Sequence, residues 1–297
     1  MNLQNRIPEI SGIIVLIASS LLATFMSISL IAVSPGVQAR SPTSGLSYVV
    51  YYLIAALVFT AIVIFIGRRK FGSVLRWVFI AVIAYVTFYV WSILGLYIAQ
   101  TYAEYYAISF AAPAIMVILL IFKYEWYVVD VAGFFLSAGV ASIWATIIGV
   151  WSSVLFLAVF AVYDYIAVYR TKHMISLAGT AMDSRLPMLF VFPSEKGTRM
   201  DGMSFPKTSA PPSERTGSGT FILGFGDIVF PCIMVASSAL YGEQNIIPFL
   251  LLPLAGAIAG IMVLLFTKVS RPAPGLPFIN SGAIAGFLVA FLAFRMF

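Results

Sequence analysis

Long runs of apolar residues, separated by short polar connections, occupy most of this chain. A helix needs about 20 mostly apolar residues to cross the hydrocarbon core of a bilayer. By this criterion the sequence predicts nine membrane-spanning helices, the fifth and sixth of which are separated only by a tight turn near Val150. The spans lie at roughly 10–33, 47–66, 75–98, 106–122, 127–149, 151–170, 219–241, 246–267 and 276–295.

The composition agrees with this pattern. Of the 297 residues, 62% are apolar and only 9% are charged, whereas soluble domains have about 45–50% apolar and about 25% charged residues. We therefore expect an all-α, multi-pass integral membrane protein, in the plasma membrane if the source is prokaryotic. The net charge of +6 comes from basic residues in the connections between apolar runs, so we expect no nucleic-acid partner.

The basic residues also predict the orientation of the chain. With a cytoplasmic amino terminus, 15 of the 17 lysines and arginines fall on the cytoplasmic side, and only Arg40 and Arg295 fall on the other. Positive charge concentrates in cytoplasmic loops, and the short 67–76 connection alone gives the same result. The prediction is a cytoplasmic amino terminus, an external carboxyl terminus and an odd number of spans.

One connection differs from the others. Residues 171–218 contain five prolines, several glycines and charges of both signs, a composition typical of a flexible loop. We treat residues 1–297 as a single polytopic membrane domain, with spans one to six within 10–170, a flexible cytoplasmic loop at 171–218, and spans seven to nine within 219–295. In this arrangement the sixth and seventh helices can move relative to each other.

Two aspartates lie inside predicted spans. An ionisable side chain at membrane depth costs about 2.5–3.5 kcal/mol on insertion scales, so each marks a candidate functional site. Asp164 lies six residues before Arg170, or about 9 Å, and Asp227 lies seven residues after Thr220, or about 10 Å. The two carboxyl groups should therefore lie at similar depth, and neighbouring antiparallel helices would bring them face to face.

Two such carboxyl groups suit hydrolytic chemistry. Hydrolysis of a peptide bond needs a base for water and an acid for the carbonyl oxygen, and a pair of carboxyls that shares one proton supplies both. Cys232 is the only cysteine and His173 the only histidine, so the common zinc and redox motifs are excluded and we expect no metal and no cofactor. The competing interpretations are a hydrogen-bonded structural aspartate and a cation site.

Helix-weakening residues accompany the second aspartate and the last span. Gly224 and Gly226 permit extended backbone and close approach, which would suit pairing with an extended substrate; close helix packing is the alternative. Phe225 between them would point toward substrate or lipid. The turn-forming run 271–277 marks the start of the last span, where unpaired backbone could also line a cavity and hold substrate.

Together these segments resemble a known family. The sequences Tyr163-Asp164, Gly224-Phe225-Gly226-Asp227 and Pro274-Gly275-Leu276-Pro277 are similar to the motifs of presenilin and signal peptide peptidase, the Gly-x-Gly-Asp intramembrane aspartyl proteases. The nine spans and the orientation match the presenilin pattern, so the resemblance covers essentially the whole chain. It is greatest to prokaryotic, archaeal, presenilin homologues. The chain departs from the pattern at Gly275, where the family usually has alanine.

The resemblance implies roles for named residues. Asp164 and Asp227 would be catalytic. The substrates would be transmembrane helices of other proteins within the lipid bilayer. Substrate-binding residues would be Tyr163, Gly224, Phe225, Gly226, Pro274, Gly275 and Leu276.

We therefore expect an intramembrane aspartyl endopeptidase. The alternative is a cation-coupled transporter or cation leak channel that uses the same aspartates, although the chain lacks the repeated halves common in transporters. A third hypothesis is an inactive homologue that only binds membrane helices. We expect Asp130 to be interfacial, and the two Gly-Ala-Ile-Ala-Gly segments at 256–260 and 282–286 to be helix-packing seams. The sequence predicts no particular oligomeric state.

Overall fold

A computed structural model describes most of the predicted spans. It covers residues 7–34, 50–51, 54–55, 58, 72–168, 186–193, 221–266 and 274–294. In this part of the chain the long helices are α1 (Ile7–Val33), α3 (Gly72–Ile98), α4 (Tyr102–Phe122), α5 (Trp126–Ile166), α7 (Phe225–Tyr241), α8 (Ile246–Phe266) and α9 (Gly275–Phe294). The shorter elements are the strands β1 (Leu189–Phe192) and β2 (Phe221–Gly224) and the 3-10 helix η5 (Glu243–Asn245).

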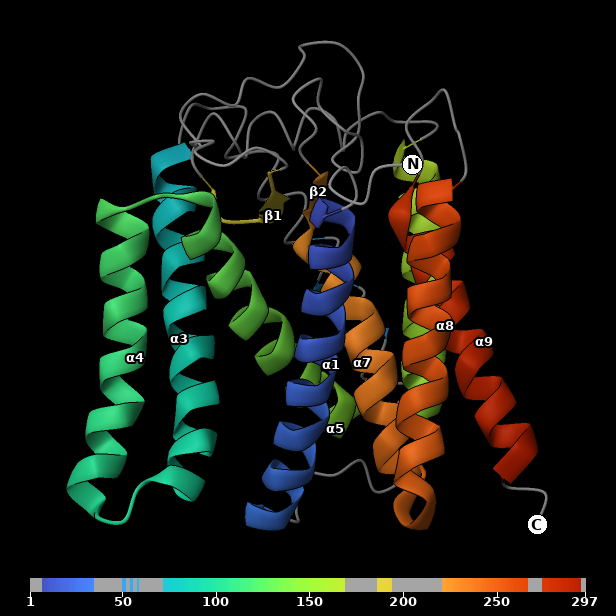
Figure 1. Ribbon diagram of the computed structural model, residues 1–297, viewed down its shortest axis with the longest axis horizontal. Helices are drawn as coiled ribbons and strands as arrows, with labels where there is room; N and C mark the ends of the chain where they lie inside the picture. Colours follow the sequence, from blue (N-terminus) through green and yellow to red (C-terminus); the bar gives the residue numbers. More distant parts are fainter. Residues whose placement is uncertain are drawn as a thin grey trace.

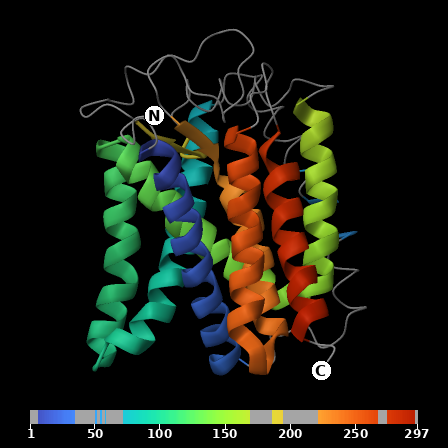
Figure 2. The same cartoon turned by 45° about the vertical axis from the view of Figure 1, so that its right-hand side comes forward.

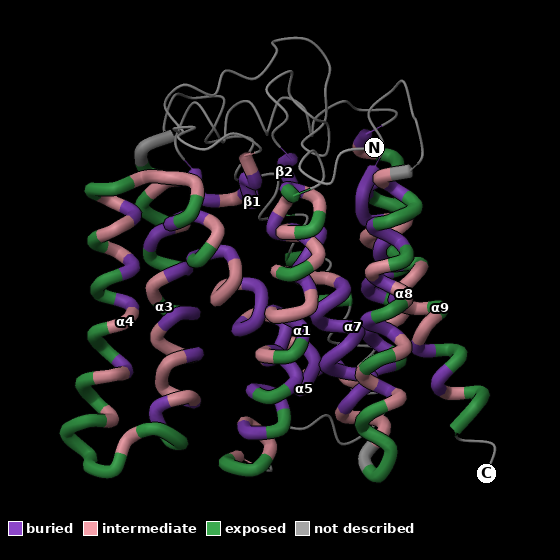
Figure 3. Tube along the Cα trace, in the orientation of Figure 1, coloured by how far each residue is buried: buried purple, intermediate pink, exposed green. Residues whose placement is uncertain are grey.

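These elements form a helical bundle with a small sheet at one end (Figure 1). Six of the described helices are long and apolar enough to cross a membrane, and α7, with 17 residues, is shorter. The first turns of α1 and α9 lie at the end that carries the sheet, and their last turns lie at the opposite end. Large apolar side chains of α4, such as Tyr102, Phe110 and Phe122, are exposed, and Figure 3 shows exposed positions along the length of this helix. Such a surface suits contact with lipid.

The described helices match the predicted spans closely, except that the seventh begins later than predicted. The predicted second span at 47–66 lies mainly outside the described residues. The predicted seventh span begins later than expected: helix α7 starts at Phe225, and residues 221–224 before it are a strand. The fifth and sixth spans are the two halves of α5.

Helix α5 reverses direction at Gly149, which has φ 69° and ψ 173°. A straight helix of 41 residues would be about 62 Å long, twice the hydrocarbon thickness of about 30 Å. The backbone conformation of Gly149 is one that residues with a side chain rarely adopt. Figure 2 shows the second half of α5 running back beside α9. The turn predicted near Val150 is confirmed.

The strand pair was not predicted. Strands β1 and β2 pair antiparallel, with Leu189 opposite Gly224 and Phe192 opposite Phe221. Strand β1 falls within the predicted flexible loop, whose other residues lie outside the described part of the chain except for 186–188 and 193. All residues of the pair except Gly224 are buried, because the sheet packs against α5 and α1.

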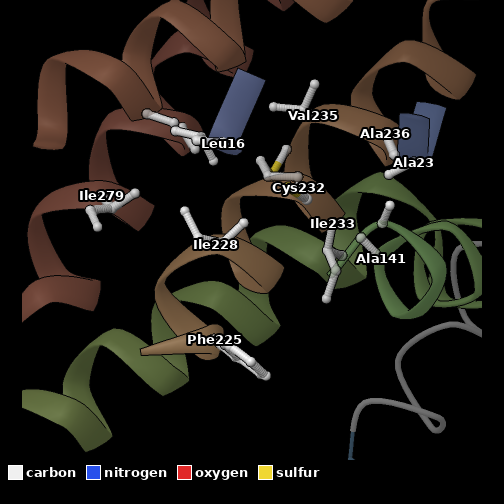
Figure 4. Close-up of a cluster of buried hydrophobic side chains, with 14 of the residues drawn as sticks. Leu16, Ala23, Ala141, Phe225, Ile228, Cys232, Ile233, Val235, Ala236 and Ile279 are labelled. Carbon is white, nitrogen blue, oxygen red and sulfur yellow. The ribbon is translucent and has the colours of Figure 1, made fainter. Parts of the chain in front are cut away.

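Helix α7 occupies the centre of the bundle and packs against α1, α5, α8 and α9. It is buried on all sides, as expected for a helix that is apolar all round. Figure 4 shows this core, in which residues of α7 meet side chains of three neighbouring helices. The labelled residues are Phe225, Ile228, Cys232, Ile233, Val235 and Ala236 of α7, Leu16 and Ala23 of α1, Ala141 of α5 and Ile279 of α9.

Helices α8 and α9 touch backbone to backbone. A methyl group built on Gly256 would overlap the carbonyl oxygen of Gly282, and one built on Gly282 would overlap the carbonyl oxygen of Gly256. The two Gly-Ala-Ile-Ala-Gly segments therefore pack against each other, which confirms the expected seam. Through this contact α8 fixes the position of α9, whose first turn lies at the candidate site.

Candidate active site

Asp164 lies near the end of α5, two residues before Ile166, and only 2% of its surface is exposed. Its Oδ2 accepts a hydrogen bond of 3.2 Å from the backbone N–H of Leu276. Leu276 is the second residue of α9, and N–H groups in the first turn of a helix have no partner within that helix. The bond therefore satisfies a free donor of α9 and connects it to α5.

Asp227 is the third residue of α7 and is 8% exposed. Its Oδ2 accepts a hydrogen bond of 3.2 Å from the backbone N–H of Gly224, the residue that precedes the helix. This is one half of a capping box; glycine has no side chain with which to form the other half. The amino-terminal end of a helix also favours a negative charge. The carboxyl of Asp227 is thus held by the start of its own helix.

The two carboxyls meet at the first turn of α9. A Cβ atom on Gly275 would lie 3.0 Å from Oδ1 of Asp227, and the next residue, Leu276, donates to Asp164. Helix α5 also packs against α7, as expected for neighbouring spans. Two aspartates 63 positions apart in the chain therefore share one buried site with the start of α9.

Five of the other predicted site residues differ in how close they lie to the two carboxyls. Gly224, Gly275 and Leu276 lie next to the carboxyls, and Pro274 directly precedes Gly275. Pro274, Gly275 and Leu276 are buried. Tyr163, in contrast, is 41% exposed, which places its side chain away from the buried Asp164.

Phe225 and Gly226 begin helix α7. The ring of Phe225 packs inside the protein, with its centroid 4.7 Å from that of Phe190 in β1. A Cβ on Gly226 would lie 3.4 Å from the ring of Phe230, one turn further along α7. The contact of Phe225 with β1 was not anticipated, because β1 itself was not predicted.

Two further polar residues connect elements around the site. Asp130 of α5 accepts a hydrogen bond of 2.8 Å at Oδ1 from the backbone N–H of Val191 in β1. Asn280 of α9 donates from Nδ2 to the carbonyl oxygen of Leu157 in α5, at 3.2 Å. The sequence predicts an interfacial position for Asp130, whereas no role was predicted for Asn280. A polar residue within an otherwise apolar span is the signal that could have identified Asn280.

The chemistry available here is that of carboxyl groups. Among the described residues no group of three or more His, Cys, Asp or Glu side chains could hold a metal ion. Two neighbouring carboxyls that share a proton can act together as acid and base toward a water molecule. Ile228, which follows Asp227, and Ile279, one turn after Leu276, are fully buried in the apolar core, where electrostatic interactions are stronger than in water.

Comparison with known proteins gives a consistent result. A family model described as signal-peptide peptidase, presenilin aspartyl protease matches residues 12–296. Two solved structures of a presenilin family intramembrane aspartate protease, one in space group C222 and one in P2, are each 26% identical and cover 97% of this chain. The matches cover 100% and 98% of those chains, with TM-scores of 0.64 and 0.63. No curated protein sequence matches.

The chain has a helical membrane fold with two buried aspartates, and the matches cover nearly its whole length. It is therefore an intramembrane aspartate protease, which is a hydrolase. The chain belongs to the signal-peptide peptidase and presenilin family. It is an integral, multi-pass membrane protein.

Proposed function

We propose that Asp164 and Asp227 are the catalytic pair and that the enzyme hydrolyses peptide bonds within transmembrane segments of other membrane proteins. The observation that carries this proposal is the convergence of both carboxyls on Gly275 and Leu276 at the first turn of α9. Both aspartates are buried within helices that consist mainly of apolar residues. Because ionisable groups are costly there, a functional role is the default interpretation.

In the proposed reaction, one carboxylate takes a proton from water while the other carboxyl donates a proton to the carbonyl oxygen of the scissile bond. The hydroxide adds to the carbonyl carbon, and collapse of the tetrahedral intermediate breaks the C–N bond as the nitrogen receives a proton. The roles of acid and base belong to the pair as a unit. The convergence of both carboxyls on the first turn of α9 supports this mechanism.

Substrate would bind in extended form beside the carboxyls, because a helix presents no free backbone groups. Strand β2 leads directly into Asp227 through Gly224, which supports pairing of its edge with an extended segment. The segment 274–276 would hold substrate backbone from the other side. We also assign Tyr163, Phe225 and Gly226 to substrate binding, on the resemblance of their motifs.

We infer nine spans with a cytoplasmic amino terminus and an external carboxyl terminus. Support comes from the opposite positions of the first turn of α1 and the last turn of α9 (Figure 1). Two basic residues also lie at the end of the bundle that carries the sheet: Arg76 in α3, which donates to the carbonyl oxygen of Leu120, and Lys123, which follows α4. Basic residues favour the cytoplasmic side.

Cleavage of a defined membrane helix tests the catalytic pair. The purified protein in proteoliposomes is incubated with a fluorescent membrane-helix peptide, and the products are identified by mass spectrometry. Asp164→Asn and Asp227→Asn should each lower the rate by at least about a thousandfold, since the remaining carboxyl cannot serve as both acid and base.

The control is Glu104→Gln, which removes a carboxylate from the exposed start of α4 and should leave cleavage unchanged. Near-normal cleavage by either asparagine variant would refute the assignment of the catalytic pair.

A further inference from the structure

Asp130 is a carboxyl near the start of α5 that the proposed mechanism does not use. It lies in the first half of α5 and is partly buried. Its Oδ1 accepts the 2.8 Å hydrogen bond from the backbone N–H of Val191 in β1. A partly buried carboxyl is costly unless it is hydrogen-bonded, so the function of this bond needs explanation.

The register of the sheet shows which edge of β1 the bond occupies. In an antiparallel pair, residues that exchange hydrogen bonds alternate with residues whose N–H and C=O groups point outward. The N–H of Phe225 donates to the carbonyl of Met188 at 3.1 Å. Two residues further along β1, Phe190 and Leu223 therefore form the next pair joined by backbone hydrogen bonds. Val191 lies between these pairs, and its N–H points away from β2. Asp130 therefore binds the outer edge of β1.

The outer edge of β2 faces the catalytic side. By the same alternation, the N–H of Gly224 points away from β1, and it donates to Oδ2 of Asp227. A segment that paired with β2 would lie beside Asp227. A segment that paired with β1 instead would lie on the far side of the sheet, separated from Asp227 by both strands.

The same face of α5 also supports the start of α7. Gly133 lies three residues after Asp130 and therefore on the same side of the helix. A Cβ on Gly133 would lie 2.5 Å from Cε1 of Phe225 and 2.8 Å from Cε1 of Phe190. This face of α5 therefore binds the backbone of β1 through Asp130 and packs closely against the rings of Phe190 and Phe225. Phe225 lies two residues before Asp227 in the chain.

We propose that Asp130 is a positioning residue that anchors β1 to α5 and occupies the outer edge of β1. It thereby holds the strand pair and Asp227 in place and leaves only the outer edge of β2 for substrate. A buried N–H that loses its acceptor is costly, so loss of this bond would let the buried strand β1 shift away from α5 and make its outer edge available for unproductive pairing. The inference rests on the proposed function and adds a residue that sets where the substrate lies.

Three substitutions at position 130 separate the hydrogen bond from other effects. Asp130→Asn keeps an acceptor oxygen and should stay within about twofold of the wild-type rate. Asp130→Ala removes the acceptor and should lower kcat by about tenfold or more, because small misplacement of reacting groups is costly. It should also spread the cut over several neighbouring bonds, without raising KM. Asp130→Glu keeps a carboxyl at a shifted position and should cut with an altered distribution of sites.

The matched control is Val131→Ala, since Val131 is the next residue on α5 and its side chain is 47% exposed. It should leave both the rate and the cut site unchanged. The proposal is overturned if Asp130→Asn loses as much activity as Asp130→Ala. It is equally overturned if Asp130→Ala cuts at the normal rate and position.

A second measurement does not depend on catalysis. Hydrogen exchange of the backbone amides of 189–192 and 221–224 should be faster in Asp130→Ala than in the wild type, and unchanged in Asp130→Asn. Unchanged exchange in Asp130→Ala would refute the anchoring role even if the enzyme cleaves as proposed. Conversely, faster exchange in Asp130→Ala than in a wild type that cleaves nothing would support the anchor while the proposed function fails. If Asp130→Ala does not fold, exchange and cut sites in Asp130→Glu decide the question.

Discussion

Asp164 and Asp227 are each stabilised by a backbone N–H at the start of a helix. Leu276 at the start of α9 serves Asp164, and Gly224 before α7 serves Asp227. Buried charge or polarity is tolerated only when hydrogen-bonded, and these donors would otherwise lack partners. The sequence identified both carboxyls but not their donors, because a backbone donor depends on where a helix begins rather than on residue type.

A side chain at position 275 would lie close to the carboxyl of Asp227, so we expect kcat/KM to fall as that side chain becomes larger. The methyl group of Gly275→Ala would lie 3.0 Å from Oδ1 of Asp227, a contact that a shift of a few tenths of an ångström relieves. We expect this variant to retain kcat/KM within about fivefold. The branched side chain of Gly275→Val would displace the carboxyl and should lower kcat/KM by about a hundredfold.

Peptide-cleavage kinetics and thermal unfolding would be measured together for these variants. Ser281→Val adds the same branched side chain to an exposed position of α9 and serves as the control. A normal rate in Gly275→Val would show that the first turn of α9 does not restrict Asp227.

At the level of elements, the helices could be predicted from hydropathy and the strands could not. Apolar runs of about 20 residues identify spans directly. In contrast, the four residues of β2 continue without interruption into the apolar run of α7, so no change in hydropathy separates strand from helix. Strand β1 is a four-residue run inside a proline-rich connection, and only its pairing with β2 and its contact with α5 make it a strand.

The reversal of α5 depends on the backbone of Gly149. Any side chain at φ 69° and ψ 173° is strained, so Gly149→Ala should lower the free energy of unfolding by about 1–3 kcal/mol. Thermal or denaturant unfolding in detergent would measure this loss. Leu155→Ala, on the exposed face of the same half of α5, is the control. An unchanged stability in Gly149→Ala would mean that the reversal tolerates a side chain.

For the whole molecule, the orientation in the membrane can be tested with cysteine labelling. The only native cysteine, Cys232, is fully buried, so a maleimide that does not cross membranes should label introduced cysteines alone. Glu104→Cys lies at the end opposite the sheet and should react in intact cells. Lys123→Cys lies at the end with the sheet and should react only after permeabilisation. The reverse pattern would invert the proposed orientation.

The contact between α8 and α9 constrains how a helix dissolved in lipid can reach the carboxyls. Their backbones touch along Gly256 and Gly282, which leaves no room for a third chain between them. A route from the bilayer that parted these two helices would have to break the tightest seam in the described bundle and would shift the turn that binds Asp164. We therefore expect lateral access for a membrane-bound polypeptide on another side of the molecule, with the α8–α9 pair acting as a fixed wall.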